Sequence, residues 1–475
     1  MQNQNWRFLN RVIVVATVTL LAVSFTTFAW AQESAGREIK GASPQAVSPR
    51  TPQAGYIYTP ESSIERPEDL GLRAHTTYVV RSVDGNKPVG LVAPQSFQVS
   101  SSFSPDAIEE AETPASLGCL YVQSPNNVKT GCVPNYASKT KGPSSAGWGA
   151  IALVDAYDNP DAASDLKTFD TYWGLPAAKF VKVEATGNGD CSSVPANAGW
   201  SVEESLDIEW AHVFAPKAVI VLVEACSNSD TDLFYAESVA IQYIQDNYGG
   251  GDVSNSWAGG EFSSESSYDF TFAGANYSDY GAPVTVFASA DDAGIGAAYP
   301  SSNPWLTSAG GTSVLRNSDG TFNSEGCWSG SGGGSSAYEK SGASTEFQYG
   351  IFGNGAPRAT PDFAADADPA SGAWIYNQYA YNGWAVVGGT SLSSPSLAGI
   401  VNRAGNKLSS WFGYYVDGYG YFTNGENNLL YAQLPTAKAY YTNFYDITTG
   451  SNGGTVTYNW DYCTGVGSPR GLLGK

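Results

Sequence analysis

Basic residues are scarce in this 475-residue chain, which has 24 lysines and arginines against 45 aspartates and glutamates. The formal net charge is -21 at pH 7, and no basic cluster interrupts it. Nucleic acids and anionic membranes attract positive patches, so we expect neither as a partner. The six cysteines include no C-x-x-C pair that would indicate zinc. No repeat of fixed period is apparent, which argues against a solenoid or propeller.

What the chain does contain is typical of a large folded protein. Hydrophobic residues make up 42% of it and aromatic residues 13%, and there are 53 glycines. Such a chain buries a sizeable core and turns often, which excludes wholesale disorder. The length exceeds that of one ordinary domain, although a large α/β core runs past it. We therefore expect one dominant domain.

The first 31 residues have the features of a secretory signal. Arg7 and Arg11 precede an uncharged apolar run from Val12 to Phe28, and Ala29-Trp30-Ala31 forms a small-x-small cleavage site. An uncleaved membrane anchor is the alternative, although the run is near the short end for spanning a bilayer. We predict a signal peptide over 1–31 and a secreted protein, extracellular or periplasmic, with no membrane contact after cleavage.

Secretion makes disulfides the expected state of the six cysteines, because the compartment is oxidising and their number is even. Sequence alone leaves 15 possible connectivities. Pairing neighbours along the chain predicts Cys119 with Cys132, Cys191 with Cys226, and Cys327 with Cys463. Two free buried thiols are the alternative.

The pattern of apolar runs predicts an α/β domain. Continuous apolar runs at 150–154, 217–223 and 284–288 are typical of buried parallel strands, and helical stretches separate them. We predict a doubly wound, mostly parallel central sheet flanked by helices. Residues 32–112 read as an irregular leader with strand-like stretches at 76–82 and 89–99. Such sheets place functional residues beyond the strand C-termini, where Asp155 and the acidic segment after Ala288 fall.

A serine stands in a segment suited to nucleophilic chemistry. Gly388-Gly389-Thr390-Ser391 leads into Leu392-Ser393-Ser394-Pro395 and a small, apolar run. Glycines before a serine that opens a helix expose its hydroxyl and leave backbone N–H groups free to stabilise negative charge. A simple helix cap is the alternative. The octet resembles the nucleophile segment of the subtilisin-like superfamily, in which the serine stands in G-T-S-x-x-x-P.

The usual histidine partner of such a serine is missing, because neither His75 nor His212 stands in an H-G-T-H motif. An acidic segment stands in its place. Ser201 and Glu204 form a capping box that predicts a helix start. Glu203 and Asp207 are then one helical turn apart, close enough to share a proton.

An acidic first turn favoured by the helix dipole is the alternative reading of these carboxylates. Together with the serine segment, E-x-x-L-D resembles the sedolisin family of serine-carboxyl peptidases. In that family a glutamate replaces the histidine base and an aspartate supports it. The resemblance assigns these roles to Glu203 and Asp207.

A third segment extends the resemblance. Ser289-Ala290-Asp291-Asp292-Ala293-Gly294, with Gly310-Gly311-Thr312 further on, is similar to the family's S-S-G-D-x-G and G-G-T series. It implies that Asp292 lines the oxyanion hole. Asp291 stands where the family has glycine, and the D-x-G spacing to Gly294 favours Asp292. An ordinary acidic loop is the alternative.

The C-terminal part resembles the family's calcium site. The resemblance implies one Ca²⁺ held by the carboxylates of Asp446 and Asp461 and by carbonyls of Ile447, Thr457 and Asn459. Two carboxylates with backbone carbonyls suit a hard cation that takes six or more oxygens.

The resemblance runs from about residue 113 to the C-terminus, which predicts a peptidase domain over 113–475. It implies that Asp155 lies behind the carboxyl pair as a supporting carboxylate. It also implies that Ser256, Trp257, Ala258 and Gly259 bind substrate backbone. The leader over 32–112 is shorter than the family's folded propeptide, so either a reduced leader inhibits the enzyme or maturation differs.

The expected function is therefore a secreted, monomeric serine-carboxyl endopeptidase that acts on proteins or peptides in acid. Ser391 would be the nucleophile and Glu203 the base. A rival triad of Ser391, His212 and Asp155 is disfavoured, because His212 lies about 500° around the helix from Asp207. An inactive peptide-binding relative and a carbohydrate-binding protein, suggested by 13 tryptophans and 29 tyrosines, are further alternatives.

Overall fold

The structure is a computed structural model that describes residues 57–81, 111–123, 146–188, 191–273, 282–317, 321–340, 343–408, 412–416 and 419–475. All of them belong to one unit, Ala54–Lys475. The predicted signal peptide, most of the leader with its stretch at 89–99, and Cys132 lie outside the described residues. Within the described ranges, no helix is both long and apolar enough to cross a membrane.

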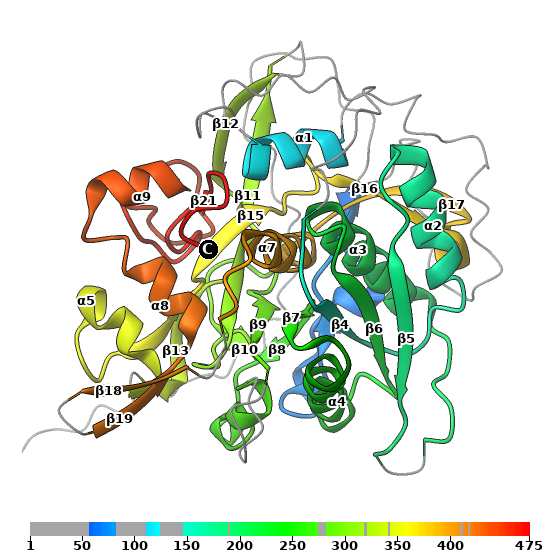
Figure 1. Cartoon of the computed structure of the whole chain (residues 1–475), viewed down its shortest axis with the longest axis horizontal. Coiled ribbons are helices and arrows are strands. Elements are labelled where there is room, and N and C mark those ends of the chain that lie inside the picture. Colours follow the sequence, from blue (N-terminus) through cyan, green and yellow to red (C-terminus); the bar gives the residue numbers. More distant parts are fainter. Residues whose placement is uncertain are drawn as a thin grey trace, which may run out of the picture. The chain divides into compact units, whose positions relative to one another are not determined.

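A mostly parallel sheet forms the centre of the unit (Figure 1). Its strands follow the order β12, β11, β9, β7, β4, β6, β5, and β15 pairs with β11 outside this path. Only β12 pairs antiparallel within this described sheet. The strands are, in that order, Phe322–Cys327, Thr307–Arg316, Val284–Ser289, Gly251–Asn255, Ala150–Ala156, Val219–Ala225, Lys179–Ala185 and, for β15, Phe363–Asp366. The three predicted apolar runs thus form β4, β6 and β9.

Helices cover both faces of the sheet, as predicted. Ile151 and Leu153 of β4 pack in one core with α2 (Ala162–Trp173), α3 (Ala198–Phe214) and α7 (Thr390–Ala404). Ala152 and Val154 alternate to the other face and pack with α4 (Asp230–Tyr248). Because successive side chains of a strand point to opposite faces, a strand buried on both sides must be apolar throughout. Figure 1 shows α3 and α7 lying beside each other.

Helix α3 begins three residues before the predicted capping box. Asn197 is its N-cap, and the Asn197 side chain accepts from the amides of Gly199 (2.9 Å) and Trp200 (3.1 Å). Asparagine satisfies the free N–H groups of a first turn as well as serine does, so the helix starts at the earlier signal. The capping-box prediction was therefore wrong, and Glu204 instead accepts from the amide of Asn159.

The shorter elements form small sheets and connecting helices around the central layer. The described part of the leader contributes three strands to two of these sheets: β3 pairs with β1 and β17, and β2 pairs with β8. The predicted strand at 76–82 is thus divided between β2 and β3. The bounds are β1 Ile57–Tyr58, β2 His75–Thr76, β3 Val79–Arg81, β8 Trp257–Gly260, β10 Ala298–Tyr299, β13 Gly334–Lys340, β14 Pro357–Thr360, β16 Ala373–Asn377, β17 Gly383–Gly388, β18 Phe412–Val416, β19 Tyr419–Thr423, β20 Phe444–Tyr445, β21 Ser468–Pro469, α1 Pro114–Gly118, α5 Tyr349–Phe352, α6 Gln378–Tyr381, α8 Gly425–Tyr431 and α9 Ala437–Asn443.

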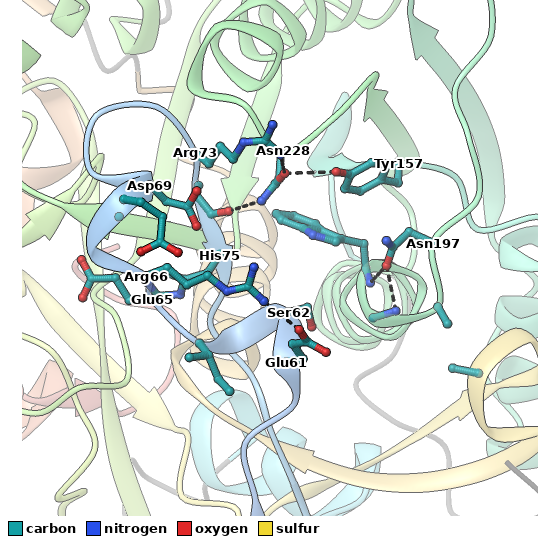
Figure 2. A pocket seen from close by; sticks show the side chains of 18 of the residues that line it. Glu61, Ser62, Glu65, Arg66, Asp69, Arg73, His75, Tyr157, Asn197 and Asn228 are labelled. Atoms are coloured by element: carbon teal, nitrogen blue, oxygen red, sulfur yellow. Dashed lines mark hydrogen bonds and ion pairs between the residues drawn. The ribbon is translucent and has the colours of Figure 1, made fainter. Parts of the chain in front are cut away.

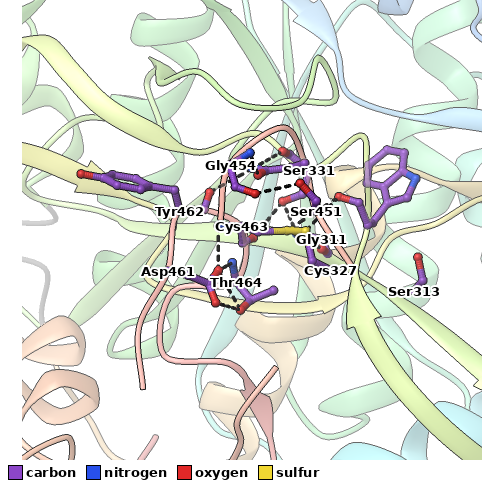
Figure 3. Close-up of a disulfide and its surroundings, with 12 residues drawn as sticks. Gly311, Ser313, Cys327, Ser331, Ser451, Gly454, Asp461, Tyr462, Cys463 and Thr464 are labelled. Atoms are coloured by element: carbon purple, nitrogen blue, oxygen red, sulfur yellow. Dashed lines mark hydrogen bonds between the residues drawn. A yellow bond between two sulfur atoms is a disulfide. The ribbon is translucent and has the colours of Figure 1, made fainter. Parts of the chain in front are cut away.

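Two of the three predicted disulfides lie within the described residues and are confirmed. Cys191 is bonded to Cys226, and Cys327 to Cys463. Cys119 is also disulfide-bonded, while its predicted partner lies outside the described residues. Figure 3 shows the disulfide that joins the end of β12 to the C-terminal loop, next to Asp461. The alternative of two free thiols is therefore wrong for the cysteines that the structure describes.

Candidate active site

The candidate residues gather at the C-terminal ends of the central strands. Asp155 is the penultimate residue of β4, Ser256 follows β7 directly, and Asp292 lies three residues beyond β9. Strand β4 lies between β6 and β7. The chain forms β5 and β6 on one side of β4 and then crosses to form β7 on the other side, so the strand order reverses here. Open α/β sheets bind ligands at such a point.

Ser391 lies in the first turn of α7, two residues after a glycine that cannot be replaced by a larger residue. Gly389 has φ +104°, in the region that favours glycine. A Cβ at Gly389 would stand 2.2 Å from the carbonyl oxygen of Thr77 and 2.6 Å from Oδ2 of Asp292. The Ser391 hydroxyl was predicted to be exposed, but it is buried, because the leader lies over it. The Ser391 Oγ is 2.8 Å from the hydroxyl of Thr77.

Glu203 and Asp207 lie on α3 and face the same buried space. Ser256 donates a 2.7 Å hydrogen bond to Oδ1 of Asp207. Both carboxyl oxygens of Glu203 are buried without a hydrogen-bond partner among the described residues. Burial raises the pKa of Glu203 well above its ordinary value, and repulsion from Asp207 and Asp155 adds to this, while the Ser391 hydroxyl lowers it. Burial likewise raises the pKa of Asp207. The two carboxyls therefore titrate as a coupled pair.

Asp155 belongs to a second group of buried carboxyls that sequence reasoning missed. It stands in register with Glu224 of the neighbouring strand β6. Burial, followed by repulsion from Glu224, raises the pKa of Asp155 well above its ordinary value. Glu224 pairs with Lys182 at 2.7 Å, and Lys182 also pairs with Asp158. A glutamate directly after the apolar run of β6 was a visible signal in the sequence, but only the strand register shows that it stands opposite Asp155.

The two neighbouring aspartates of the loop after β9, Asp291 and Asp292, have different conformations and contacts. Asp291 has a left-handed backbone (φ +82°), which accounts for the family's glycine at that position. Oδ1 of Asp292 accepts from the amide (2.7 Å) and hydroxyl (2.9 Å) of Thr390, whereas its Oδ2 is buried without a partner in the described structure. Burial raises the pKa of Asp292 well above its ordinary value, although the Thr390 amide lowers it. Asp292, not Asp291, thus contacts the nucleophile segment.

The predicted substrate-binding segment, Ser256 to Gly259, lies beside Ser391 and forms most of β8. Its backbone pairs with the leader strand β2. The indole of Trp257 points away from this edge, because it is buried and donates to the carbonyl of Val154 at 2.9 Å. Only the main chain of Trp257 is therefore available to a peptide, and its side chain belongs to the core.

The histidine alternative gains no support. His212 lies in the last turn of α3, and its Nε2 lies 2.8 Å from the carbonyl oxygen of Pro176 and 3.4 Å from Oδ1 of Asp170. Its Nδ1 is buried without a partner among the described residues. No hydrogen bond of the described chain joins His212 to Ser391 or Asp155.

The predicted calcium ligands lie on the loop between β20 and β21. Oδ1 of Asp446 accepts from the amide of Asn459 (3.0 Å). The hydroxyl of Tyr440 lies 3.0 Å from this Oδ1 and 3.1 Å from the carbonyl oxygen of Asn459, so the two oxygens converge. Asn459 has φ +73°, a left-handed conformation that asparagine adopts more readily than most residues. In the part of the chain described, no three His, Cys, Asp or Glu side chains form a metal-binding group, so a cation here would depend on backbone carbonyls.

The remaining predicted ligands surround the same loop. Oδ1 of Asp461 accepts from the amides of Cys463 (2.9 Å) and Thr464 (2.8 Å), which fixes this carboxylate beside the Cys327–Cys463 disulfide (Figure 3). The predicted donor set would consist of these two carboxylates and the carbonyls of Ile447, Thr457 and Asn459. These hard oxygens fit Ca²⁺.

Comparison with known proteins places this architecture in a family. No family model matches the chain. Kumamolisin from Bacillus sp. (strain MN-32) is 30% identical over 354 residues, which is 68% of this chain and 58% of kumamolisin. Sedolisin from Pseudomonas sp. (strain 101) is 30% identical over 185 residues, 36% of this chain and 28% of that protein. The matched part thus spans less than two thirds of either relative.

A solved structure agrees with these relatives. Pseudomonas sedolisin, a serine-carboxyl proteinase complexed with two molecules of pseudo-iodotyrostatin, matches with a TM-score of 0.58 and 21% identity, over 76% of this chain and 96% of that one. The central sheet and its flanking helices are those of a subtilisin-like fold. By sequence and by fold, the chain belongs to the sedolisin family.

Proposed function

We propose that this protein is a secreted serine-carboxyl endopeptidase that hydrolyses peptide bonds of protein substrates in acid. One observation carries the proposal: Ser391, the carboxyl pair Glu203 and Asp207, and Asp292 lie together at the C-terminal ends of the central strands. The first three are buried and Asp292 is half-buried. Polar groups without mutual ion pairing are costly to bury, so a function is the simplest reason to keep them there.

Ser391 is the proposed nucleophile. Its Oγ attacks the carbonyl carbon of the scissile bond while Glu203 accepts its proton, and Glu203 then delivers that proton to the leaving amine. Asp207 positions Glu203 and is itself fixed by the hydrogen bond from Ser256. Water completes the reaction by hydrolysing the acyl-enzyme with Glu203 again as the base.

Asp292 is the proposed oxyanion donor. Because its Oδ1 already accepts two hydrogen bonds from Thr390, a proton on this carboxyl belongs on the unpartnered Oδ2. That oxygen and the amide of Ser391 would then both donate to the developing negative charge. The raised pKa of Asp292 keeps the carboxyl in the protonated form that the role requires.

The two roles restrict the working pH to the acid side. Asp292 donates only while protonated, so activity should be lost as the pH rises through its pKa. Glu203 accepts a proton only while ionised, so activity should also fall as the pH drops through the first pKa of the pair. Removal of the leader would admit water and reduce the burial of Glu203, which moves its pKa back toward the ordinary acidic range.

The proposal predicts acid-limited hydrolysis that depends on Ser391. Hydrolysis of an unfolded protein should be measured from about pH 2 to 8 with enzyme collected from the culture medium. Wild type should be active only in acid, and Ser391→Ala should be inactive. Ser396→Ala is the matched control: Ser396 is buried on the same helix, and its hydroxyl has no partner among the described residues. Equal activity of Ser391→Ala and wild type would refute the proposal.

We also propose that the loop between β20 and β21 binds one Ca²⁺ through Asp446, Asp461 and the carbonyls of Ile447, Thr457 and Asn459. The ion would hold this loop closed and so stabilise the fold. Chelation should lower the melting temperature and added Ca²⁺ should restore it. At about a hundredfold excess of Ca²⁺ over Kd, binding adds about 2.7 kcal/mol to the free energy of unfolding. The melting temperature of Asp446→Asn should respond to neither treatment. A wild-type protein that melts identically with chelator and with Ca²⁺ would exclude the site.

A further inference from the structure

The C-terminal end of strand β8 is incompletely packed. The strand pairs with β10, with Gly259 opposite Tyr299. A cavity of about 600 Å³ borders its last residues, Gly259 and Gly260, and Glu65 of the leader also lines this cavity (Figure 2). Because glycines carry no side chain to fill that space, the position of the strand end depends on the residue that follows, Glu261.

Glu261 ties the strand end to β13 and to a short 3-10 helix, η7 (Glu265–Ser267). Its Oε2 accepts from the amide of Ala337 in β13 (2.9 Å). Its Oε1 is buried and has no amide, hydroxyl or ammonium donor among the described residues. The carboxyl of Glu265 lies within hydrogen-bonding range of Glu261 and accepts at its own Oε2 from the amide of Phe262 (2.7 Å). A proton on Oε1 of Glu265 therefore supplies the donor that Glu261 lacks.

A second pair of carboxyls repeats this arrangement. Asp269, in the next 3-10 helix η8 (Asp269–Phe272), lies within hydrogen-bonding range of Glu339 on β13. Oε1 of Glu339 is buried, has no amide, hydroxyl or ammonium donor in the described chain, and belongs to a residue that is only 6% exposed. Asp269 is also buried, and its Oδ1 accepts from the hydroxyl of Tyr299 (3.4 Å). This leaves Oδ2 of Asp269 to carry a proton to Glu339.

Burial is the main reason that these carboxyls keep their protons. Burial raises the pKa of Glu265 to about 8 and that of Asp269 to about 9, and repulsion from the facing glutamates adds to both. Burial also raises the pKa of Glu339, although its hydrogen bond to Asp269 and the charge of Arg358 lower it. The guanidinium of Arg358 is itself bonded to Asp362 (2.9 and 2.5 Å), so most of its charge is compensated there.

The other groups around the two pairs do not offset a negative charge at the strand end. Oε1 of Glu65 would stand 2.7 Å from a Cβ at Gly260, so the leader adds a further carboxyl. Tyr299 of β10 contributes a neutral hydroxyl. Helix α4 packs against η8 with the ring of Phe234. Lys340, the neighbour of Glu339 in β13, is exposed. Ionisation of the paired carboxyls would therefore leave like charges facing each other in buried surroundings.

We propose that protonated Glu265 and Asp269 are acid-dependent positioning residues that hold the end of β8 against β13. Each donates to its facing glutamate, and we call the two pairs together the acid lock. Since the folded pKa values lie above those of the unfolded chain, the stabilisation is fully present below the unfolded values and is lost as the pH rises through the folded ones. The lock is thus closed in acid and opens on the alkaline side of neutrality. Its effect on substrate rests on the proposed function, in which β8 binds substrate backbone.

Hydrogen exchange tests the lock without any hydrolysis. The parent is Ser391→Ala, so that no chain is cut, and exchange is compared at about pH 5 and about pH 9 after correction for the intrinsic effect of pH. Protection of residues 257–272 should fall by about tenfold or more relative to β4. Glu265→Gln combined with Asp269→Asn should prevent this fall, because an amide donates at every pH. Glu184→Gln, at an exposed position, should behave like the parent.

Three exchange results would overturn the lock. They are no loss of protection over 257–272, an equal loss in 257–272 and in β4, which would mean global opening, and the same local loss in the double amide variant.

A kinetic test separates positioning from chemistry. At the pH of maximal activity, Glu265→Ala should raise KM for casein by about tenfold while kcat stays within about twofold of wild type, and Glu265→Gln should restore KM. An unchanged KM, or a loss confined to kcat, would contradict the positioning role. A wild-type protein that hydrolyses nothing would overturn the proposed function, whereas the exchange experiment would still decide whether the lock exists.

Discussion

Glu203→Gln should lower kcat for protein hydrolysis by about 10²–10⁴-fold at the pH of maximal activity. Glutamine has nearly the same size as glutamate but cannot accept the proton of Ser391. In the structure both oxygens of the Glu203 carboxyl face buried space without a partner among the described residues, so the amide should fit there without breaking a hydrogen bond. The loss should therefore appear in kcat, with the fold retained. Steady-state kinetics together with a melting curve measure both quantities.

Glu209→Gln is the matched control for this variant. Glu209 lies on the same helix and is equally buried, but both of its oxygens accept from the amide of Tyr376 (3.1 and 3.4 Å). Its amide variant still accepts that bond, so kcat should stay within about twofold of wild type. Activity near neutral pH that survives Glu203→Gln would contradict the glutamate base.

The melting temperature should fall by roughly 10 °C or more between pH 4 and pH 8. The fall in melting temperature is expected because the fold buries many carboxyls and burial raises their pKa. Glu237 on α4 and Asp252 on β7 are fully buried, and burial raises the pKa of each to about 8. Burial raises the pKa of Glu426 on α8 to about 8 as well. In the unfolded chain these groups titrate near 4.

The sign follows from proton uptake. Between about pH 4 and pH 8 the folded protein binds more protons at these groups than the unfolded chain, so stability falls as the pH rises. The stabilisation is fully present below the unfolded pKa and is lost as the pH passes the folded pKa. For one fully buried group this amounts to roughly 3–5 kcal/mol. A protein with this core is suited to acid.

Glu237→Gln isolates one group. The variant removes one titrating carboxyl, so its melting temperature should depend less on pH than that of wild type. Glu184→Gln, at an exposed position of β5, is the control and should melt like wild type at each pH. The measurement is a series of thermal unfolding curves from pH 4 to pH 8. A wild-type protein that gains stability over this interval would contradict the prediction.

The sequence predicted the sheet and the ordered motifs because each is a local pattern. Continuous apolar runs marked β4, β6 and β9, and short spacings marked Ser391 and Asp292. The predicted start of α3 was wrong because two possible N-cap residues, Asn197 and Ser201, stand four residues apart. Which of the two residues caps the helix depends on the packing of the first turn and not on the local sequence.

The covered active site could not be predicted in this way. Thr77 and Ser391 are separated by 314 residues, and pairing of β2 with β8 and of β3 with β17 is a choice among many strand edges. The register of Asp155 with Glu224 has the same character. Contacts of this kind follow from the folded backbone, because the local sequence around one residue does not indicate which distant residue it will contact.

If the chain is the proposed protease, it is exposed to its own activity, and the disulfide between Cys327 and Cys463 then has a consequence. It joins residues 136 positions apart. A cut at any peptide bond between them would leave two fragments that stay covalently attached. Nicked molecules would therefore keep one mass under non-reducing conditions and separate only after reduction. A single band on a non-reducing gel therefore does not show that the chain is uncut. Cuts between the two cysteines can accumulate while the C-terminal part stays attached.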